Sequence, residues 1–160
     1  MRPLAIASIA CLAVSVTAQA QASTKHFQLG VSSFATVVNS DSATRGNDEF
    51  AGISVHGTGA PNDYVAVRGL FAHQENTDIS GLDLNAFEVS GLLGTGLATE
   101  GFKAYGSIGF FDEELDANGT TFDFNGAMIG AGIGYNWSPV GIDFWINIRD
   151  SSDYEDLVPG

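Results

Sequence analysis

The sequence is poor in cysteine and in positive charge, and it has no long apolar run after its first residues. Cys11 is the only cysteine among 160 residues, so a disulfide framework is excluded. Six basic residues face 19 acidic ones, for a net charge of −13. This balance excludes nucleic-acid binding, which needs a basic surface. No later segment has the 18 or so successive apolar residues of a membrane-spanning helix.

The first 22 residues have the pattern of a secretory signal peptide. Arg2 precedes an apolar run that starts at Pro3, and small residues follow up to Ala20 or Ala22. The run is too short for a spanning helix. Lipidation at Cys11 is disfavoured, because the residues before it lack the usual leucine. We therefore predict a cleaved signal peptide over residues 1–22 and one exported domain over residues 23–160.

An alternating hairpin near the carboxyl end is the clearest structural signal. In Gly126 to Trp137, apolar residues alternate with Gly130, Gly132 and Gly134, which is the period of a strand. A turn over residues 138–141 carries proline at its second position and glycine at its fourth. The run that follows alternates in the same way. The 20 glycines and 11 phenylalanines of the whole sequence also favour an all-β protein.

The two faces of these strands predict a barrel with an apolar outside. A soluble sandwich sends polar residues to water, whereas this pattern fits a narrow lumen filled by side chains, with the apolar face turned to lipid. The residues predicted to face lipid include Ile129, Ile133, Tyr135, Trp137, Phe144 and Ile146. Strand parity places five charged residues inside: Arg68, Glu88, Lys103, Asp143 and Arg149. We expect them to form a network of compensating charges. A selective ion path is disfavoured, because eight strands leave an interior just filled by side chains.

Seven strands can be assigned by alternation. They cover residues 26–39, 50–57, 64–73, 84–94, 102–110, 126–137 and 142–150, with a possible bulge near Phe34. Residues 112–125 are predicted to be a long acidic loop. The connections alternate in character, since one set holds fifteen acidic residues and the other holds only Asp63 and Glu100. Outer-membrane barrels have this asymmetry, with short periplasmic turns and longer outer loops.

On these features, residues 26–150 resemble a small, porin-like outer-membrane β-barrel of the eight-stranded, Gram-negative type. The resemblance rests on the signal peptide, the alternating segments of about ten residues and repeats such as IGAGIGYNW. It implies an antiparallel up-and-down transmembrane barrel in the outer membrane. It also implies contact with outer-membrane lipid and lipopolysaccharide and with the outer-membrane assembly machinery. Such barrels usually end on a strand with a terminal aromatic residue, whereas this sequence ends in DYEDLVPG. We therefore expect an incomplete barrel whose first and seventh strands are facing edges.

Candidate metal ligands occur in the predicted acidic loop. Glu114, Asp116, Asn118 and Gly119 imitate the start of an EF-hand loop, but Asn125 stands where a bidentate glutamate is needed. Strands rather than helices flank the segment. A hairpin loop with its turn at Asn118 and Gly119 is therefore favoured over a dedicated calcium site. Neither a metal nor another cofactor is predicted, although clustered carboxylates could bind lipopolysaccharide through divalent cations.

Catalysis is the weaker interpretation of the remaining polar residues. His26, His56 and His73 could join Ser54 or Ser107 in a hydrolytic triad, but they lie on separate strands and no nucleophile elbow occurs. The leading hypothesis is a non-enzymatic outer-membrane barrel with acidic extracellular loops, serving envelope integrity or surface interaction. The alternative is a soluble periplasmic barrel that binds a small apolar ligand. A lipid-modifying barrel enzyme ranks third.

Overall fold

The computed structural model describes residues 9–19, 27–38, 48–76, 82–117, 119–137 and 140–149. They form eight strands and no helix. The strands are β1 (Ile9–Gln19), β2 (Phe27–Val38), β3 (Asp48–Gly59), β4 (Val65–Asn76), β5 (Leu82–Thr95), β6 (Gly101–Ala117), β7 (Thr120–Asn136) and β8 (Val140–Arg149). The described segments contain no helix long and apolar enough to cross a membrane.

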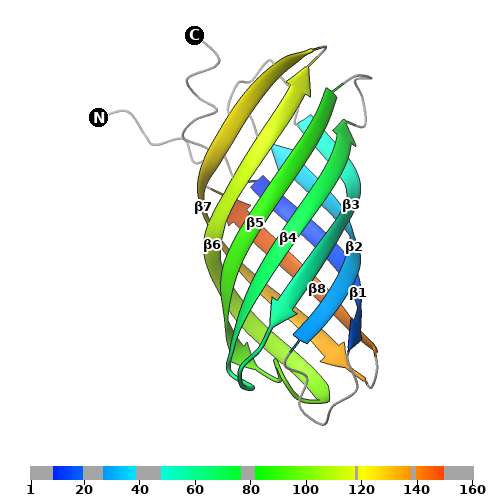
Figure 1. Ribbon diagram of the computed structural model, residues 1–160, viewed down its shortest axis with the longest axis vertical. Helices are drawn as coiled ribbons and strands as arrows, with labels where there is room; N and C mark the ends of the chain where they lie inside the picture. The colour runs from blue at the N-terminus through cyan, green and yellow to red at the C-terminus, as the bar shows by residue number, and fades with distance from the viewer. Residues whose placement is uncertain are drawn as a thin grey trace, which may run out of the picture.

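The strands close into one antiparallel up-and-down barrel (Figure 1). Each strand pairs with the next along the chain, and β1 pairs with β8. The predicted fold class is therefore confirmed, and all seven predicted strands are present as β2 to β8. The strands lie tilted against the long axis, as closure of a small barrel requires.

The prediction of facing, unpaired edges is wrong for this structure. The strands expected to be edges, β2 and β8, are each paired with β1. Strand β1 falls on residues that we assigned to the signal peptide. Its sequence, IACLAVSVTAQ, alternates apolar with small or polar residues after Ala10, so the same stretch satisfies both patterns. The sequence after Asp150, predicted to be a tail, lies outside the described residues.

The predicted acidic loop over residues 112–125 is also wrong, because most of it is strand. Strands β6 and β7 pair from Asp112↔Asn125 up to Ala117↔Thr120. Between them, Gly119 has a φ of 87°, which a tight hairpin turn favours and which other residues avoid. The turn at Gly119 agrees with the hairpin interpretation of this segment. The acidic residues therefore stand on a long two-stranded hairpin, at the top in Figure 1.

Two smaller expectations about side-chain direction are corrected as well. No bulge occurs at Phe34, because the β2–β3 register is continuous from Phe27↔Gly59 to Val38↔Asp48. Phe34 faces the interior and is fully buried. Because the other inward residues of β2 are mostly polar or small, an apolar residue at this position looks in the sequence like a shift in the alternation, which a bulge would cause. In the predicted strand over residues 64–73, the alternation places Tyr64 on the inner face with Arg68, but Tyr64 precedes β4 and is 63% exposed.

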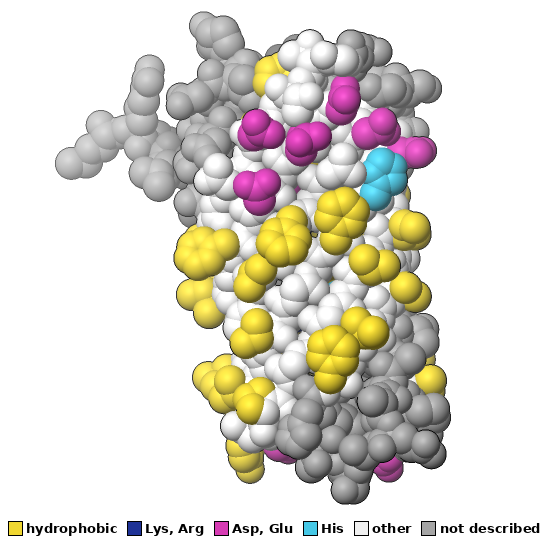
Figure 2. Space-filling view, viewed as in Figure 1, with side chains coloured by type: hydrophobic (Ala, Val, Ile, Leu, Met, Phe, Trp, Pro, Cys, Tyr) yellow, Lys and Arg dark blue, Asp and Glu magenta, His cyan; other side chains and the backbone are white. Residues whose placement is uncertain are grey.

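The barrel has its apolar side chains outside and many of its polar side chains inside. Large hydrophobic residues are exposed on every strand from β2 to β8, and on the face seen in Figure 2 they form a broad band over the middle and lower part of the molecule. Carboxylate side chains gather on one side of this band, towards the β6–β7 hairpin. Among the side chains that the structure describes, sixteen polar or charged ones are buried in the interior, together with aromatic ones such as Phe34, Tyr105 and Trp145. This polarity is the reverse of that in a water-soluble barrel.

Candidate functional site in the barrel lumen

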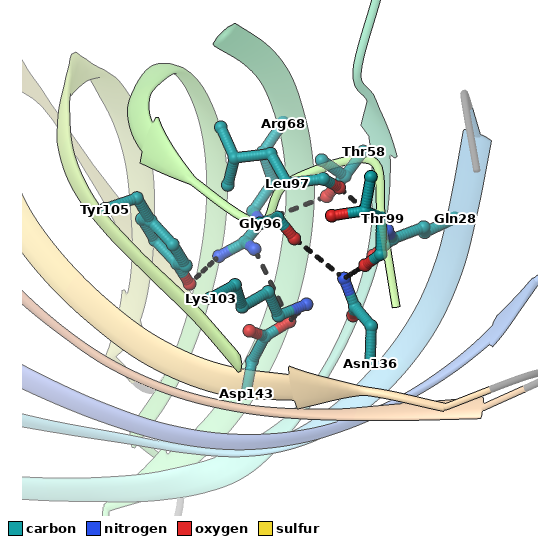
Figure 3. Close-up of polar contacts among 10 residues, drawn as sticks. All are labelled: Gln28, Thr58, Arg68, Gly96, Leu97, Thr99, Lys103, Tyr105, Asn136 and Asp143. Carbon is teal, nitrogen blue, oxygen red and sulfur yellow. Dashed lines mark hydrogen bonds and ion pairs between the residues drawn. The ribbon is translucent and has the colours of Figure 1, made fainter. Parts of the chain in front are cut away.

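A buried carboxylate, Asp143 on β8, organises one half of the lumen. Its Oδ2 lies 2.7 Å from Nζ of Lys103 and 3.7 Å from an Nη of Arg68. Asp143 is completely buried and both cations are nearly so. The three side chains come from β4, β6 and β8, so the ion pairs cross the lumen instead of following one sheet face (Figure 3). They connect strands that are not neighbours.

Arg68 is fixed by contacts on all sides of its guanidinium group. Its Nε donates to Oγ1 of Thr58 at 3.1 Å, and Nη1 donates to the hydroxyl of Tyr105 at 3.0 Å. The guanidinium carbon lies 4.6 Å from the ring centroid of Trp145 and 5.2 Å from that of Tyr105. Such cation–π contacts compensate a desolvated cation. These contacts hold the Arg68 side chain in one position in the lumen, where it links residues of several strands.

A second charged cluster contains Arg149, Glu88 and Glu113. The guanidinium of Arg149 donates to both carboxylates, and Nδ2 of Asn147 donates to Oε2 of Glu88 at 3.2 Å. Arg149 is fully buried, and its guanidinium carbon lies 5.8 and 5.1 Å from the ring centroids of Phe34 and Phe111. Glu113 is also fully buried, although the sequence placed it in a solvated loop. Continuing the alternation of β6 beyond Phe111 would have shown that it points inward.

The two clusters have opposite net charge. Arg68 and Lys103 outnumber Asp143 by one positive charge, whereas Glu88 and Glu113 outnumber Arg149 by one negative charge. Taken together, the six charges cancel. The structure thus brings all five predicted inner charges into ion pairs and adds Glu113. In a balanced, paired set, the attraction between opposite charges offsets part of the cost of removing them from water.

Three glycines on the inner face of β7 make room for this network. A Cβ added at Gly132 would collide with the ring of Tyr105, and one at Gly134 would collide with Asp143 and Lys103. A Cβ at Gly130 would meet the side chains of Asn147 and Ser107. Because these three positions of β7 have no side chain, the large side chains of neighbouring strands have room to extend across the lumen.

Gly132→Ala is expected to lower the free energy of unfolding by about 1–3 kcal/mol, the usual effect of overpacking. The added methyl group must displace Tyr105 and, with it, the hydrogen bond to Arg68. Gly69→Ala is the matched control, because nothing lies within 4 Å of a Cβ there. Urea unfolding of refolded protein in lipid vesicles measures both. Equal stability of the two variants would contradict the packing role.

The turn between β5 and β6 folds into one end of the lumen. Leu97 and Ala98 are 4% and 1% exposed. Nδ2 of Asn136 donates to the carbonyls of Gly96 and Thr99, each at 3.0 Å. Nε2 of Gln28 donates to the carbonyl of Leu97 at 3.2 Å. Side chains from β2 and β7 therefore hold this turn across the mouth of the barrel, as Figure 3 shows.

Asp63, in the turn between β3 and β4, forms hydrogen bonds that hold the β5–β6 turn in place. Its carboxylate accepts hydrogen bonds from the backbone N–H groups of Gly96 and Ala98, both at 3.2 Å, and from the hydroxyl of Thr99 at 2.8 Å. The N–H of Leu97 donates to the Asp63 carbonyl at 3.1 Å. The Thr99 hydroxyl, followed by the backbone donors, holds the pKa of Asp63 below its ordinary value of 3.8. The sequence counted Asp63 only as one of two acidic residues at this end.

Asp63→Ala is expected to lower the free energy of unfolding by about 1–2 kcal/mol at neutral pH, a value reduced for the exposure of the carboxylate. Because the folded pKa lies below 3.8, the contribution of the carboxylate is complete above that pH and is lost as the pH falls through the folded pKa. The stability difference between wild type and variant should therefore shrink below pH 3.8. Thr99→Val should weaken this pH dependence. A difference that stays constant with pH would refute the role.

The other candidate residues are not brought together by the structure. Glu114 is exposed on β6, and Asp116 accepts a hydrogen bond from the N–H of Gly119 at 3.0 Å; Asn118 lies outside the described residues. Among the described residues, no three His, Cys, Asp or Glu side chains are grouped to hold a metal ion. The residues predicted to face lipid are 43–58% exposed on the outside: Ile129, Ile133, Tyr135, Trp137, Phe144 and Ile146.

The histidines do not form a triad within the described part of the chain. His56 is buried, with its ring 5.4 Å from that of Trp145, and neither ring nitrogen has a hydrogen-bond partner. The hydroxyl of Ser54 bonds with that of Ser32 at 2.5 Å. His73 is exposed and bonds with Asn85 at 2.8 Å, while His26 lies outside the described residues. His56 therefore faces the lumen, next to Trp145.

Comparison with known proteins agrees with this architecture. The outer membrane protein beta-barrel domain family matches residues 6–157. The chain belongs to this family. Its place in the family agrees with an all-β outer-membrane barrel, as the sequence predicted. The crystal structure of Ail, the attachment invasion locus protein of Yersinia pestis, is similar over 92% of this chain and 98% of Ail, with 12% identity and a TM-score of 0.40. Among curated proteins, none matches the chain.

Proposed function

We propose that this outer-membrane barrel is a non-enzymatic envelope protein that presents an acidic hairpin and acidic loops to the outside of the cell. The observation that carries the proposal is the combination of a filled lumen with an acidic end. Ion pairs cross the lumen at Asp143 and at Arg149, and Leu97 fills the opposite mouth. A barrel of eight strands filled in this way is suited to structure and surface contact, and poorly suited to conduction.

The proposed orientation puts the acidic end outside and the turns near Asp63 in the periplasm. Short turns on the periplasmic side and longer connections outside are usual for such barrels. Tyr135 and Trp137, whose rings lie 4.6 Å apart, stand on the outer surface next to the β7–β8 turn, where an aromatic girdle is expected. Residues 1–22 would act as a cleaved signal peptide in export, and residues 23–160 would form the mature domain.

Cysteine labelling on intact cells tests this orientation. In a Cys11→Ser background, Thr120→Cys places a thiol at the tip of the β6–β7 hairpin and Pro61→Cys places one in the β3–β4 turn. Both positions are exposed. A membrane-impermeant maleimide should label Thr120→Cys on whole cells and should label Pro61→Cys only after lysis. The reverse labelling pattern would contradict the proposed topology. Recovery of the protein in a detergent-free soluble fraction would contradict the membrane location.

Lipopolysaccharide is the proposed partner of the acidic end. Glu114 and Asp123 lie directly opposite each other on β6 and β7, and both are exposed. Like charges in such a pair repel each other unless a cation reduces the repulsion, and calcium or magnesium could bridge them to lipopolysaccharide phosphates. Binding of purified protein to lipopolysaccharide should fall on adding EDTA. It should also fall in a Glu114→Gln, Asp123→Asn variant; binding unaffected by either change would exclude the bridge.

The soluble, ligand-binding alternative receives no support from the arrangement of side chains. A barrel that binds an apolar ligand needs an apolar interior, whereas Arg68, Lys103 and Asp143 cross this one. The outer surface carries exposed rings such as Phe102, Phe110 and Phe144, which a soluble protein would bury. The enzymatic alternative is also weaker, because His56 and Ser54 are not paired with each other.

A further inference from the structure

We propose that a groove on the outer surface of β5, β6 and β7 binds one membrane lipid whose head group carries a primary ammonium group. The groove has a volume of about 440 Å³. Four apolar side chains, one carboxylate and one amide are exposed along it: Phe87, Val89, Phe110, Ala127, Asp112 and Asn125. The groove therefore combines apolar walls, which suit an acyl chain, with a charge at one end, which can recognise a head group.

The groove exists because small residues of β7 lie beside large residues of β6 and β5. Phe110 of β6 is directly opposite Ala127 of β7, and the residue before Ala127 is Gly126. Val89 of β5 is opposite Phe110 on the other side of β6. Phe87 and Phe110 are 52% and 73% exposed, so their rings extend further from the sheet than the adjoining surface of β7. An acyl chain along β7 would fill this step in the surface.

The charged end of the groove must supply its selectivity. Apolar contact alone does not distinguish lipids, because every lipid around a barrel offers acyl chains of the same polarity. Asp112 lies two residues beyond Phe110 and therefore on the same face of β6, and Asn125 is directly opposite Asp112 on β7. In Figure 2, carboxylates gather immediately above the exposed hydrophobic side chains. A lipid whose chain lies in the groove would bring its head group to Asp112 and Asn125.

The electrostatics of this end favour an ammonium group over a phosphate. The three basic side chains that the structure describes all lie in the lumen: Arg68, Lys103 and Arg149. Their ion pairs are with other carboxylates, so no described cation neutralises Asp112. Glu114, the next outward residue of β6, adds a second exposed negative charge. A primary ammonium group can donate charge-assisted hydrogen bonds to Asp112 and to the side-chain oxygen of Asn125. A phosphate would be repelled unless a divalent cation bridged it.

A second groove on the same outer surface differs in the feature that should matter. It has a volume of about 310 Å³ and is lined by residues of β7 and β8, among them Ala131, Ile133 and Phe144. No charged residue lines this groove. It should therefore accept an acyl chain without regard to the head group, which makes it the matched comparison for the groove at Asp112.

Native mass spectrometry of the purified protein tests the assignment. The protein in non-ionic detergent is given equal amounts of phosphatidylethanolamine and phosphatidylglycerol with identical acyl chains and no divalent cation. We expect one phosphatidylethanolamine per barrel, retained about two- to fivefold more than phosphatidylglycerol, which is the range expected of one partly exposed ion pair. Asp112→Asn should remove this preference. Ala127→Phe fills the groove and should also remove it, whereas Ala131→Phe, the same change in the second groove, should leave it unchanged.

Three results would overturn the proposal. The first is equal retention of the two lipids by the wild type, and the second is a preference that survives Asp112→Asn. The third is a preference for phosphatidylglycerol that appears only with magnesium, because a bridged phosphate would then occupy the groove. Heat-modifiable gel mobility checks that each variant is folded. The proposed orientation is tested separately by the labelling of Thr120→Cys and Pro61→Cys, so failure of the lipid site leaves that result unaffected.

Discussion

Arg149→Leu is expected to lower the free energy of unfolding by about 3–5 kcal/mol, the usual cost of leaving a buried charge without its partner. The guanidinium of Arg149 is the only group among the described contacts that donates to both Glu88 and Glu113. Both carboxylates are at most 3% exposed, so water cannot replace it. The two like charges would also repel each other across the lumen. Urea unfolding in lipid vesicles, followed by tryptophan fluorescence, measures the loss.

The control combines Arg149→Leu with Glu88→Gln and Glu113→Gln. If the loss comes from uncompensated carboxylates, neutralising them should return a large part of the stability, because a pair replaced by neutral groups of similar size is often tolerated. If the loss came only from missing packing against Phe34 and Phe111, the triple variant would be no more stable than Arg149→Leu. That outcome would contradict the electrostatic explanation.

Strand parity was sufficient to predict most of the lumen. Arg68, Lys103 and Asp143 could be placed inside because each lies in a run with strict period-two alternation. In a barrel, whether a side chain points inward depends only on its position in the alternation of its own strand, so it can be predicted without knowing which strands are neighbours. What parity could not supply is which charges meet, since Lys103 and Asp143 are 40 residues apart and their contact depends on the closed sheet.

Three features of the structure were not predicted from the sequence, and each has its own physical reason. The inward direction of Glu113 does not stand out in the sequence, because the acidic residues around it resemble a solvated loop, although β6 continues through them beyond the apolar band. Asp63 was missed because its hydrogen bonds reach a turn more than 30 residues away. Strand β1 was assigned to export alone, because an apolar run rich in small residues satisfies a signal peptide and a barrel strand equally.

Ile133→Arg is expected to have the second of the two largest effects, because it places a cation in the middle of the apolar band. Ile133 is 54% exposed on the outside of β7, between Ile129 and the aromatic pair Tyr135 and Trp137. An arginine on the lipid face near the bilayer midplane costs about 2–4 kcal/mol, and the cost falls towards the interfaces. The variant should therefore insert less efficiently into vesicles and unfold at lower urea concentration.

Two controls separate the lipid effect from other consequences of this substitution. Ile133→Leu keeps an apolar group of the same size and should leave insertion unchanged. Thr120→Arg introduces the same cation at an exposed position beyond the band, on the tip of the β6–β7 hairpin, and should cost at most about 1 kcal/mol. Insertion is measured by heat-modifiable gel mobility after refolding into vesicles. If Ile133→Arg and Thr120→Arg insert equally well, the surface that carries Ile133 does not face lipid, and the proposed membrane band would have to be abandoned.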